Sequence, residues 1–266
     1  MGYYMQKIYL DYNLFIYLMD NRNEMLSQAV DRLSYPNIFV YSPAHIEEVA
    51  VLNKGTIDSE AIRQLSFIEN LTKCNELLPS EEKTILKEEQ PITCYKRVIN
   101  DYRINGYVEE NERCFLRYLK SLDPKGSYSK VVSNNSEGIL SQDNYHKDLM
   151  EILQKDCLLR ELFGKEILKD DIILFRESLD AQRHFVKERI LELAFNYLEL
   201  IRYKPESIKK SRSRIHDCSH AIYASSADIF VTNDKRFLDK IKAVYNYFSI
   251  NTKILSLDEF VEQNPL

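Results

Sequence analysis

Short apolar runs alternate with amphipathic segments at both ends of this chain, and that alternation restricts the fold more than any other feature. The runs are "KIYL" at 7–10, "NIFVY" at 37–41, "NELLPS" at 75–80, "ADIFVTND" at 227–234 and "TKILS" at 252–256. Short apolar runs bounded by turn or helix signals are typical of buried strands. Because strands that are separated by helices pair in parallel within one sheet, the sequence predicts an α/β fold with a parallel sheet flanked by helices.

The segments between these runs have the spacing of amphipathic helices. They cover 12–19, 23–35, 43–52 and 59–73 in the first part of the chain, and 235–241 and 257–263 in the last part. Pro36 ends the second segment, while Ser42 is a suitable N-cap and Pro43 a suitable first-turn residue for the third. We expect each apolar run to lead into one or two helices.

The middle of the chain has a different pattern of apolar and charged residues. Charged segments of helical period, such as 111–122 and 181–203, replace the apolar runs, and we expect no strand between about 80 and 205. Residues 123–148 are rich in Ser, Asn and Gly and are predicted to form a long loop. We therefore predict a discontinuous α/β domain, 1–90 with 205–266, and an all-α inserted subdomain at 91–204.

Composition argues against several classes of protein. The chain has 266 residues, with 36 Lys and Arg against 41 Asp and Glu, and its net charge of −5 disfavours indiscriminate binding to polyanions. We expect no membrane span and no export, because an 18-residue apolar run and the features of a signal peptide are both missing. Five cysteines without a CxxC pair indicate neither a disulfide framework nor a zinc knuckle, so we expect a cytoplasmic protein.

Four acidic positions lie where a parallel sheet would bring them together. Asp11 follows the first strand and Asp234 lies three residues beyond "IFV", so both are expected at the carboxyl edge of the sheet, where α/β proteins bind ligands. Glu48, or its neighbour Glu47, lies early in the helix after the second strand, and Asp217 is expected to open the helix before "ADIFVTND". Crowded carboxylates repel one another unless a cation compensates, and Mg²⁺ or Mn²⁺ prefers such oxygen ligands. The set predicts a site for one or two divalent ions.

Three motifs resemble those of PIN-domain nucleases. The resembling residues are Asp11 and Asn13 in "IYLDYN", Glu48 in "SPAHIEEV", and Asp217, Thr232 and Asp234 in "HDCSHAIYASSADIFVTND". The resemblance covers about residues 5–90 and 205–266. It implies a PIN-like sheet of order 3-2-1-4-5, a metal-dependent ribonuclease site at the four carboxylates, and a role as a toxin, in defence or in RNA processing. Members of this family often form dimers or bind an inhibitor, which leaves open an oligomer or a partner protein on the helical insertion.

Each of these residues also has a simpler explanation. Asp11 could merely end a strand, Asp234 could be the N-cap of the helix at 235–241, and Glu48 could be a solvated charge on a helix face. The resemblance assigns Asn13 and Thr232 to orienting the carboxylates or water, but either side chain could instead bond to the local backbone. The ordered set, more than any single residue, supports a metal site.

Two histidines flank Asp217 four residues apart on the same predicted helix. His216 and His220 have the spacing of zinc ligands, but no third His or Cys lies at a familiar spacing. His220 could lie near the acidic pocket and touch a phosphate or a carboxylate, although histidines more often pack or face solvent. We therefore assign neither histidine as a metal ligand.

A basic stretch leads directly into Asp217. Residues 202–214, "RYKPESIKKSRSR", contain six basic side chains against one acidic side chain. Of these, Lys209, Lys210, Arg212 and Arg214 are predicted to hold the phosphates of a nucleic acid, with RNA favoured over DNA. A solvated run of loop charges is the competing interpretation.

The leading hypothesis is thus a metal-dependent endoribonuclease, and three alternatives remain open. A DNA nuclease of the flap type would use a related fold. A phosphatase of the haloacid dehalogenase type would use Asp11 as a nucleophile, but it requires a second Asp where this chain has Asn13. A scaffold protein would work through its central helices and carry a degenerate acidic site.

Overall fold

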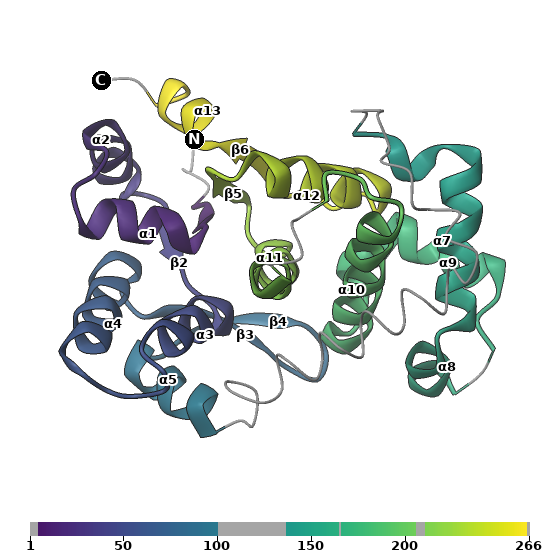
Figure 1. Ribbon diagram of the computed structural model, residues 1–266, viewed down its shortest axis with the longest axis horizontal. Coiled ribbons are helices and arrows are strands. Elements are labelled where there is room, and N and C mark those ends of the chain that lie inside the picture. Colours follow the sequence, from purple (N-terminus) through teal and green to yellow (C-terminus); the bar gives the residue numbers. More distant parts are fainter. Residues whose placement is uncertain (1–4, 101–136, 165, 206–210, 265–266) are drawn as a thin grey trace.

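A parallel sheet of four strands lies at the centre of the protein. The computed structural model describes residues 5–100, 137–164, 166–205 and 211–264. The strands are β1 (Lys7–Leu10), β2 (Ile38–Val40), β5 (Ile229–Thr232) and β6 (Lys253–Ser256), in the order β2-β1-β5-β6 (Figure 1). Ile8 pairs with Phe39 on one side and with Ile229 on the other. The predicted α/β class, with a parallel sheet flanked by helices, is confirmed.

Helices connect these strands. In the first part of the chain they are α1 (Tyr12–Met19), α2 (Glu24–Leu33), α3 (Pro43–Leu52) and α4 (Ser59–Thr72), and in the last part α11 (Ser211–Ala224), α12 (Lys235–Tyr247) and α13 (Leu257–Glu262). The six helical segments that the sequence predicts in these two parts are all helices. Ser42 is the N-cap of α3, with Pro43 in its first turn. Across the described ranges, no helix combines the length and the apolar character needed to cross a membrane.

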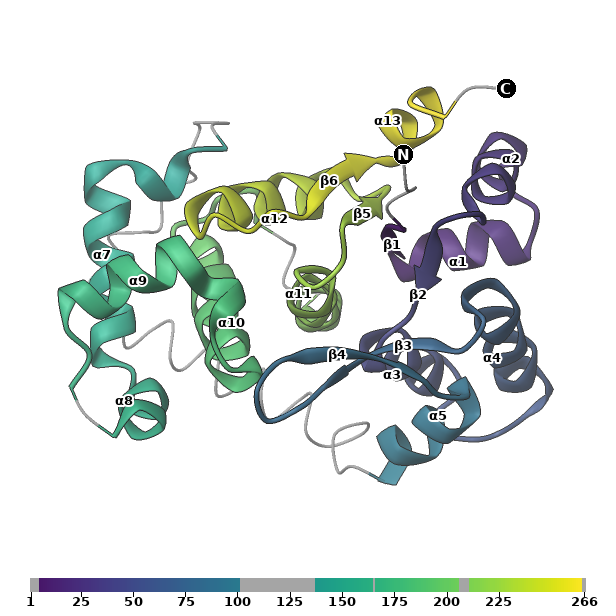
Figure 2. The same cartoon turned by 180° about the vertical axis from the view of Figure 1, so that it is seen from behind.

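Each face of the sheet has its own hydrophobic core. Successive strand residues point to opposite faces, so Tyr9 and Phe230 pack under α10 (His184–Leu200), α11 and α12, while Ile8 and Val231 pack against α1 to α4 and α13. Figure 2 shows the same arrangement from behind, with α7 to α10 grouped on the side of the molecule away from α1, α2 and α4. The sheet therefore lies between two layers of helices.

The predicted third strand, β3 (Asn75–Pro79), pairs antiparallel with β4 (Thr84–Glu88) in a hairpin. One parallel bridge joins this hairpin to the end of β2, because Tyr41 N–H donates to the carbonyl of Asn75 at 3.0 Å and Leu77 N–H donates to the carbonyl of Tyr41 at 2.7 Å. β3 thus touches the sheet beside β2 without being one of its four strands. The expectation of no strand between about 80 and 205 was wrong for β4. This strand is mostly exposed and carries charges, so it lacks the apolar run of a buried strand.

The described part of the central region is helical. It contains α5 (Pro91–Asn100), η2 (Ile139–Ser141), α7 (Asp143–Lys155), α8 (Cys157–Phe163), α9 (Lys169–Ser178), η3 (Leu179–Ala181) and α10. The helix predicted at 181–203 corresponds to α10, whereas the helix predicted at 111–122 lies outside the described residues. The long loop predicted at 123–148 was wrong at its described end, where α7 begins. Leu149 and Leu153 are buried at helical spacing there and outweigh the polar composition of the segment.

The central helices share a core with the sheet. Apolar residues of α10, among them Leu191 and Leu198, belong to the same buried cluster as Tyr9 and Phe230 of the sheet. The domain boundaries predicted around 91–204 remain a prediction.

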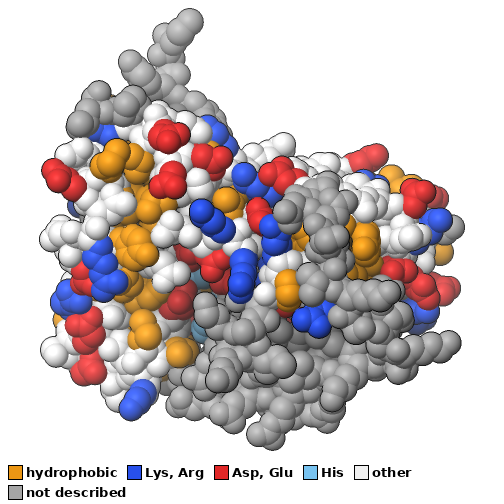
Figure 3. Space-filling model, turned by 45° about the horizontal axis from the view of Figure 1, so that its top comes forward, with side chains coloured by type: hydrophobic (Ala, Val, Ile, Leu, Met, Phe, Trp, Pro, Cys, Tyr) orange, Lys and Arg blue, Asp and Glu red, His pale blue; other side chains and the backbone are white. Residues whose placement is uncertain are grey.

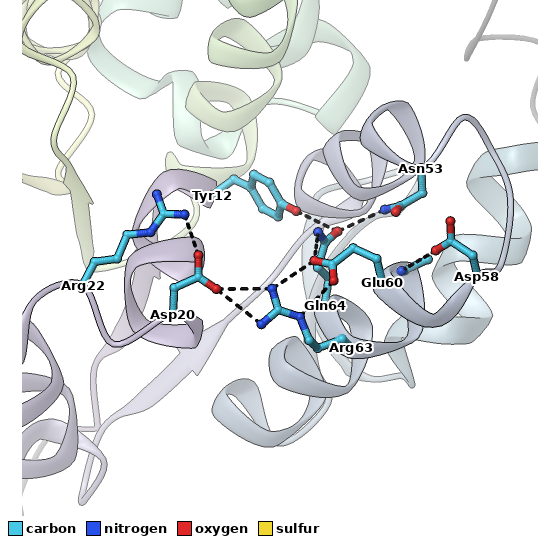
Figure 4. A network of polar contacts seen from close by, with 9 residues as sticks. Tyr12, Asp20, Arg22, Asn53, Asp58, Glu60, Arg63 and Gln64 are labelled. Atoms are coloured by element: carbon cyan, nitrogen blue, oxygen red, sulfur yellow. Dashed lines mark hydrogen bonds and ion pairs between the residues drawn. The ribbon is translucent and has the colours of Figure 1, made fainter.

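A network of polar side chains joins α1, α3 and α4 (Figure 4). Gln64 Oε1 accepts hydrogen bonds from the hydroxyl of Tyr12 at 3.2 Å and from Asn53 Nδ2 at 3.1 Å. Arg63 forms an ion pair with Asp20 at the end of α1. Tyr12 begins α1 and Asn53 caps the end of α3, so α4 is hydrogen-bonded to the start of α1 and to the end of α3.

Candidate functional site

Asp11 is the first residue after β1 and lies at the carboxyl edge of the sheet. Its backbone N–H donates to the carbonyl of Val231 at 2.8 Å, so β5 still holds the residue in register. Its side chain is buried, and Oδ2 accepts a hydrogen bond from Thr232 Oγ1 at 2.8 Å. Burial raises the pKa of Asp11 above its ordinary value; the charge of His220 opposes this rise, and the charge of Glu48 adds to it.

Glu48 and His220 approach Asp11 from two different layers of helices. Glu48 lies on α3 and His220 on α11, and His220 Nε2 lies 2.7 Å from Glu48 Oε1. His220 is 1% exposed and Glu48 is 24% exposed. Potential ligand atoms of Asp11, Glu48 and His220 all lie within 4.8 Å of one another. Glu48, and not Glu47, belongs to this group of three.

The charge state of His220 follows from these neighbours. Burial lowers the pKa of His220, but the hydrogen bond with Glu48 and the charges of Glu48 and Asp11 outweigh burial, so the pKa is raised above its ordinary value. The imidazole therefore carries positive charge toward the two carboxylates over a wider pH range than an ordinary histidine does.

Asp217 lies in the middle of α11 and not at its start as predicted, because α11 begins at Ser211. The Ser and Arg residues before it are compatible with a helix interior, and Arg has a high helix propensity. Burial raises the pKa of Asp217 well above its ordinary value; the charge of Asp11 adds to the rise, the buried Lys240 of α12 opposes it, and Asp234 adds to it again. Asp217 is thus electrostatically coupled to the cluster, although it is outside the compact group of Asp11, Glu48 and His220.

Asp234 is the N-cap of α12, as its simpler explanation predicted. Its Oδ1 accepts hydrogen bonds from the backbone N–H groups of Arg236 at 2.8 Å and Phe237 at 3.0 Å. Its own N–H donates to Thr232 Oγ1 at 3.1 Å. Because Thr232 also donates to Asp11, one hydroxyl group links the start of α12 to the carboxylate at the end of β1.

The remaining predicted site residues have no described contact with the cluster. Asn13 is exposed in the first turn of α1. Lys209 and Lys210 lie outside the described residues, and only the backbone of Arg212 and Arg214 is described, within the first turns of α11. Their roles as phosphate-binding side chains stay predictions.

A chain of buried hydrogen bonds runs from the cluster into the protein. The Tyr9 hydroxyl lies 2.7 Å from His220 Nδ1 and 2.7 Å from Ser42 Oγ. Ser42 Oγ lies 3.3 Å from His45 Nδ1, and His45 Nε2 lies 2.8 Å from the carbonyl of Leu10. Tyr9, Ser42 and His45 are fully buried. The chain begins at Glu48 and ends on the backbone of β1, one residue before Asp11.

The sequence did not predict this row of hydrogen bonds. Tyr9 looks like any aromatic residue of a buried strand, and Ser42 was assigned only as a helix cap. The position of His45, three residues after an N-cap serine, is the one available signal, because the third helical residue is where side chains return to the cap. Lys240 was also missed, since a lysine in a charged helix gives no hint of burial.

Figure 3 shows one face of the molecule, on which a histidine side chain is visible only in a recess bordered by acidic side chains. The contacts of Asp11, Glu48 and His220 describe a largely buried cluster of two carboxylates and one imidazole. Comparison of the chain with protein-family models, with curated proteins and with solved structures finds no significant match.

Proposed function

We propose that this protein is a metal-dependent nuclease that hydrolyses phosphodiester bonds of RNA at the carboxyl edge of its sheet. The observation that carries the proposal is the convergence of Asp11 and Glu48 in one compact group. Asp217, from a third segment of the chain, is electrostatically coupled to both of them. Burial raises the pKa of Asp11, and the charge of Glu48 adds to this rise. Burial and then the charge of Asp11 raise the pKa of Asp217. Carboxylates crowded in this way are stabilised by a cation.

The chemistry of the donors fits a divalent ion. Asp11 and Glu48 would hold Mg²⁺ or Mn²⁺ through their oxygens, with Asp217 and Asp234 supplying further negative charge around it. When bound, such an ion would lower the pKa of a coordinated water and neutralise charge on a phosphodiester. The strand order β2-β1-β5-β6, with the bridge that sets β3 beside β2, supports the proposed PIN-like order 3-2-1-4-5.

The protein's own residues prepare this site in two ways. Thr232 holds one oxygen of Asp11 and the first N–H of the α12 cap, which fixes the orientation of the carboxylate. The network around Gln64 holds the start of α1 and the end of α3, so that Asp11 and Glu48 keep their separation without a ligand.

The position of the basic run supports a nucleic-acid substrate. Arg212 and Arg214 lie on α11 within two turns of Asp217. A nucleic acid whose phosphates bind these arginines would therefore lie next to the acidic site. RNA is proposed over DNA because the motifs resemble those of ribonucleases.

A cleavage assay tests this proposal. End-labelled single-stranded RNA and DNA of the same sequence are incubated with the full chain in Mn²⁺, in Mg²⁺ and in excess chelator. We expect metal-dependent cleavage of RNA that Asp11→Asn abolishes and that the matched control Asp31→Asn, an exposed carboxylate on α2, leaves unchanged. Cleavage in chelator at the full rate, or equal cleavage by Asp11→Asn and wild type, would overturn the proposal.

A further inference from the structure

His220 is placed as a ligand would be, and its surroundings determine which nitrogen faces the carboxylates. His220 belongs with Asp11 and Glu48 to the group whose ligand atoms lie within 4.8 Å of one another. Its Nε2 lies 2.7 Å from Glu48 Oε1, and its Nδ1 lies 2.7 Å from the hydroxyl of Tyr9. The side chain is 1% exposed. Packing therefore fixes the ring with one nitrogen in the acidic group and the other outside it.

The far end of the hydrogen-bond chain has a defined direction. The carbonyl of Leu10 can only accept, so His45 carries its proton on Nε2. The N–H of Ser42 can only donate, and it lies 3.1 Å from His45 Nδ1, so Nδ1 is an acceptor. His45 is thus neutral, and the Ser42 hydroxyl, at 3.3 Å, can donate to Nδ1 only by sharing its one lone pair with the Ser42 N–H.

The acceptor at His45 Nδ1 also affects which groups donate in the hydrogen bonds between His45 and His220. If Ser42 donates to His45, the hydroxyl of Tyr9 donates to Ser42 Oγ and leaves its oxygen to accept the N–H of His220 Nδ1. In that order His220 keeps a proton on Nδ1. In either proton order, Nε2 must carry a proton to form the hydrogen bond with Glu48 Oε1 at 2.7 Å when no cation is bound.

We propose that His220 Nε2 is a direct ligand of the divalent cation, which makes the site a mixed centre of one imidazole and carboxylates and favours Mn²⁺ over Mg²⁺. The inference rests on the proposed function, because it concerns the same ion. The cation replaces the proton between His220 Nε2 and Glu48 Oε1, and that proton leaves to solvent. Tyr9 then accepts from the Nδ1–H, which is the usual support for a metal-bound histidine. Imidazole ligands suit transition metals, whereas Mg²⁺ is held almost entirely by oxygen.

Pulsed electron paramagnetic resonance of Mn²⁺ bound to the full chain tests this directly, without any measurement of cleavage. We expect modulation from a coordinated ¹⁴N in the wild type and its replacement by ¹⁵N modulation when the protein is made with ¹⁵N-labelled histidine. The labelled wild type needs no variant, so the test does not depend on the folding of a substituted chain.

Variants identify which histidine is the ligand. His220→Gln should remove the nitrogen signal, while His146→Gln should keep it. His146 is a matched control, because its Nδ1 lies 2.8 Å from the hydroxyl of Tyr247, on α7 and α12, in the same kind of pair as His220 and Tyr9. Tyr9→Phe should keep the signal and weaken Mn²⁺ binding about 10- to 100-fold, because it removes the support of Nδ1.

The outcomes separate the two proposals. Bound Mn²⁺ without nitrogen modulation, or with modulation unchanged in His220→Gln, overturns the ligand role and leaves the nuclease proposal standing, with His220 acting only to hold Glu48. An absence of Mn²⁺ binding in titrations of the wild type overturns both.

Discussion

Replacing Thr232 by valine tests whether the site is organised around Asp11. Valine has the shape of threonine but no hydroxyl, and the residue is 1% exposed, so the change removes two buried hydrogen bonds with little change in packing. The bond to Asp11 Oδ2, at 2.8 Å, involves a charged acceptor and is worth about 1.5–3 kcal/mol. The bond from Asp234 N–H, at 3.1 Å, is worth about 0.5–1.5 kcal/mol.

The two losses sum to about 2–4.5 kcal/mol, and the additional buried methyl group returns up to about 0.8 kcal/mol. We therefore expect Thr232→Val to lower the free energy of unfolding by about 1–4 kcal/mol at neutral pH. Urea denaturation with an unchanged m-value measures this difference. Thr232→Ser is the control, because it keeps the hydroxyl and loses only a methyl group.

The loss should also depend on pH. The Thr232 hydroxyl lowers the pKa of Asp11, so the wild type gains from this bond when Asp11 is ionised and gains less when it is protonated. The difference in stability between wild type and Thr232→Val should therefore be full above the raised pKa of Asp11 and should shrink as the pH falls through it. If Thr232→Val and Thr232→Ser lose equal stability, or if the difference does not change with pH, the hydroxyl does not support Asp11 as argued.

Three further results are expected. Burial and then the charge of Lys187 lower the pKa of His184 to about 4, so as the pH falls His184 is protonated in the unfolded chain before it is protonated in the folded protein. The wild type should therefore lose about 3 kcal/mol more stability than His184→Gln between pH 7.5 and pH 4. Urea denaturation at each pH measures this difference. Mn²⁺ at 100 times its Kd should stabilise the wild type by about 2.7 kcal/mol in thermal scans and Asp11→Asn by much less, and an equal gain would place the ion elsewhere. Neutralising Arg212 and Arg214 together should lower the logarithmic salt slope of RNA binding by about 1.4 in filter-binding titrations, and an unchanged slope would mean that no phosphate contact is made there.

The elements of the α/β part could be predicted because each carries a local signal. The apolar runs before Asp11 and Asn233 mark strands that are buried on both faces, and such strands read as apolar whatever their partners. β4 lacked that signal because it is an exposed hairpin strand held by one neighbour. The start of α11 was placed too late because a run of Ser and Arg looks like a loop, although those residues continue a helix when its other face is packed.

The residues of the site also differ in whether local sequence signals or long-range packing determine their positions. Asp11 and Asp234 could be located from the strands that precede them, since the end of a parallel strand has a fixed place in the fold. The contact between Glu48 and His220 joins residues that are 172 positions apart, on two helices that pack against each other. Whether those two side chains meet depends on the packing of α3 against α11, and no spacing within either helix encodes it. A histidine dismissed for want of a third zinc ligand at a familiar spacing thus lies 2.7 Å from one predicted carboxylate, because its partners come from other segments of the chain.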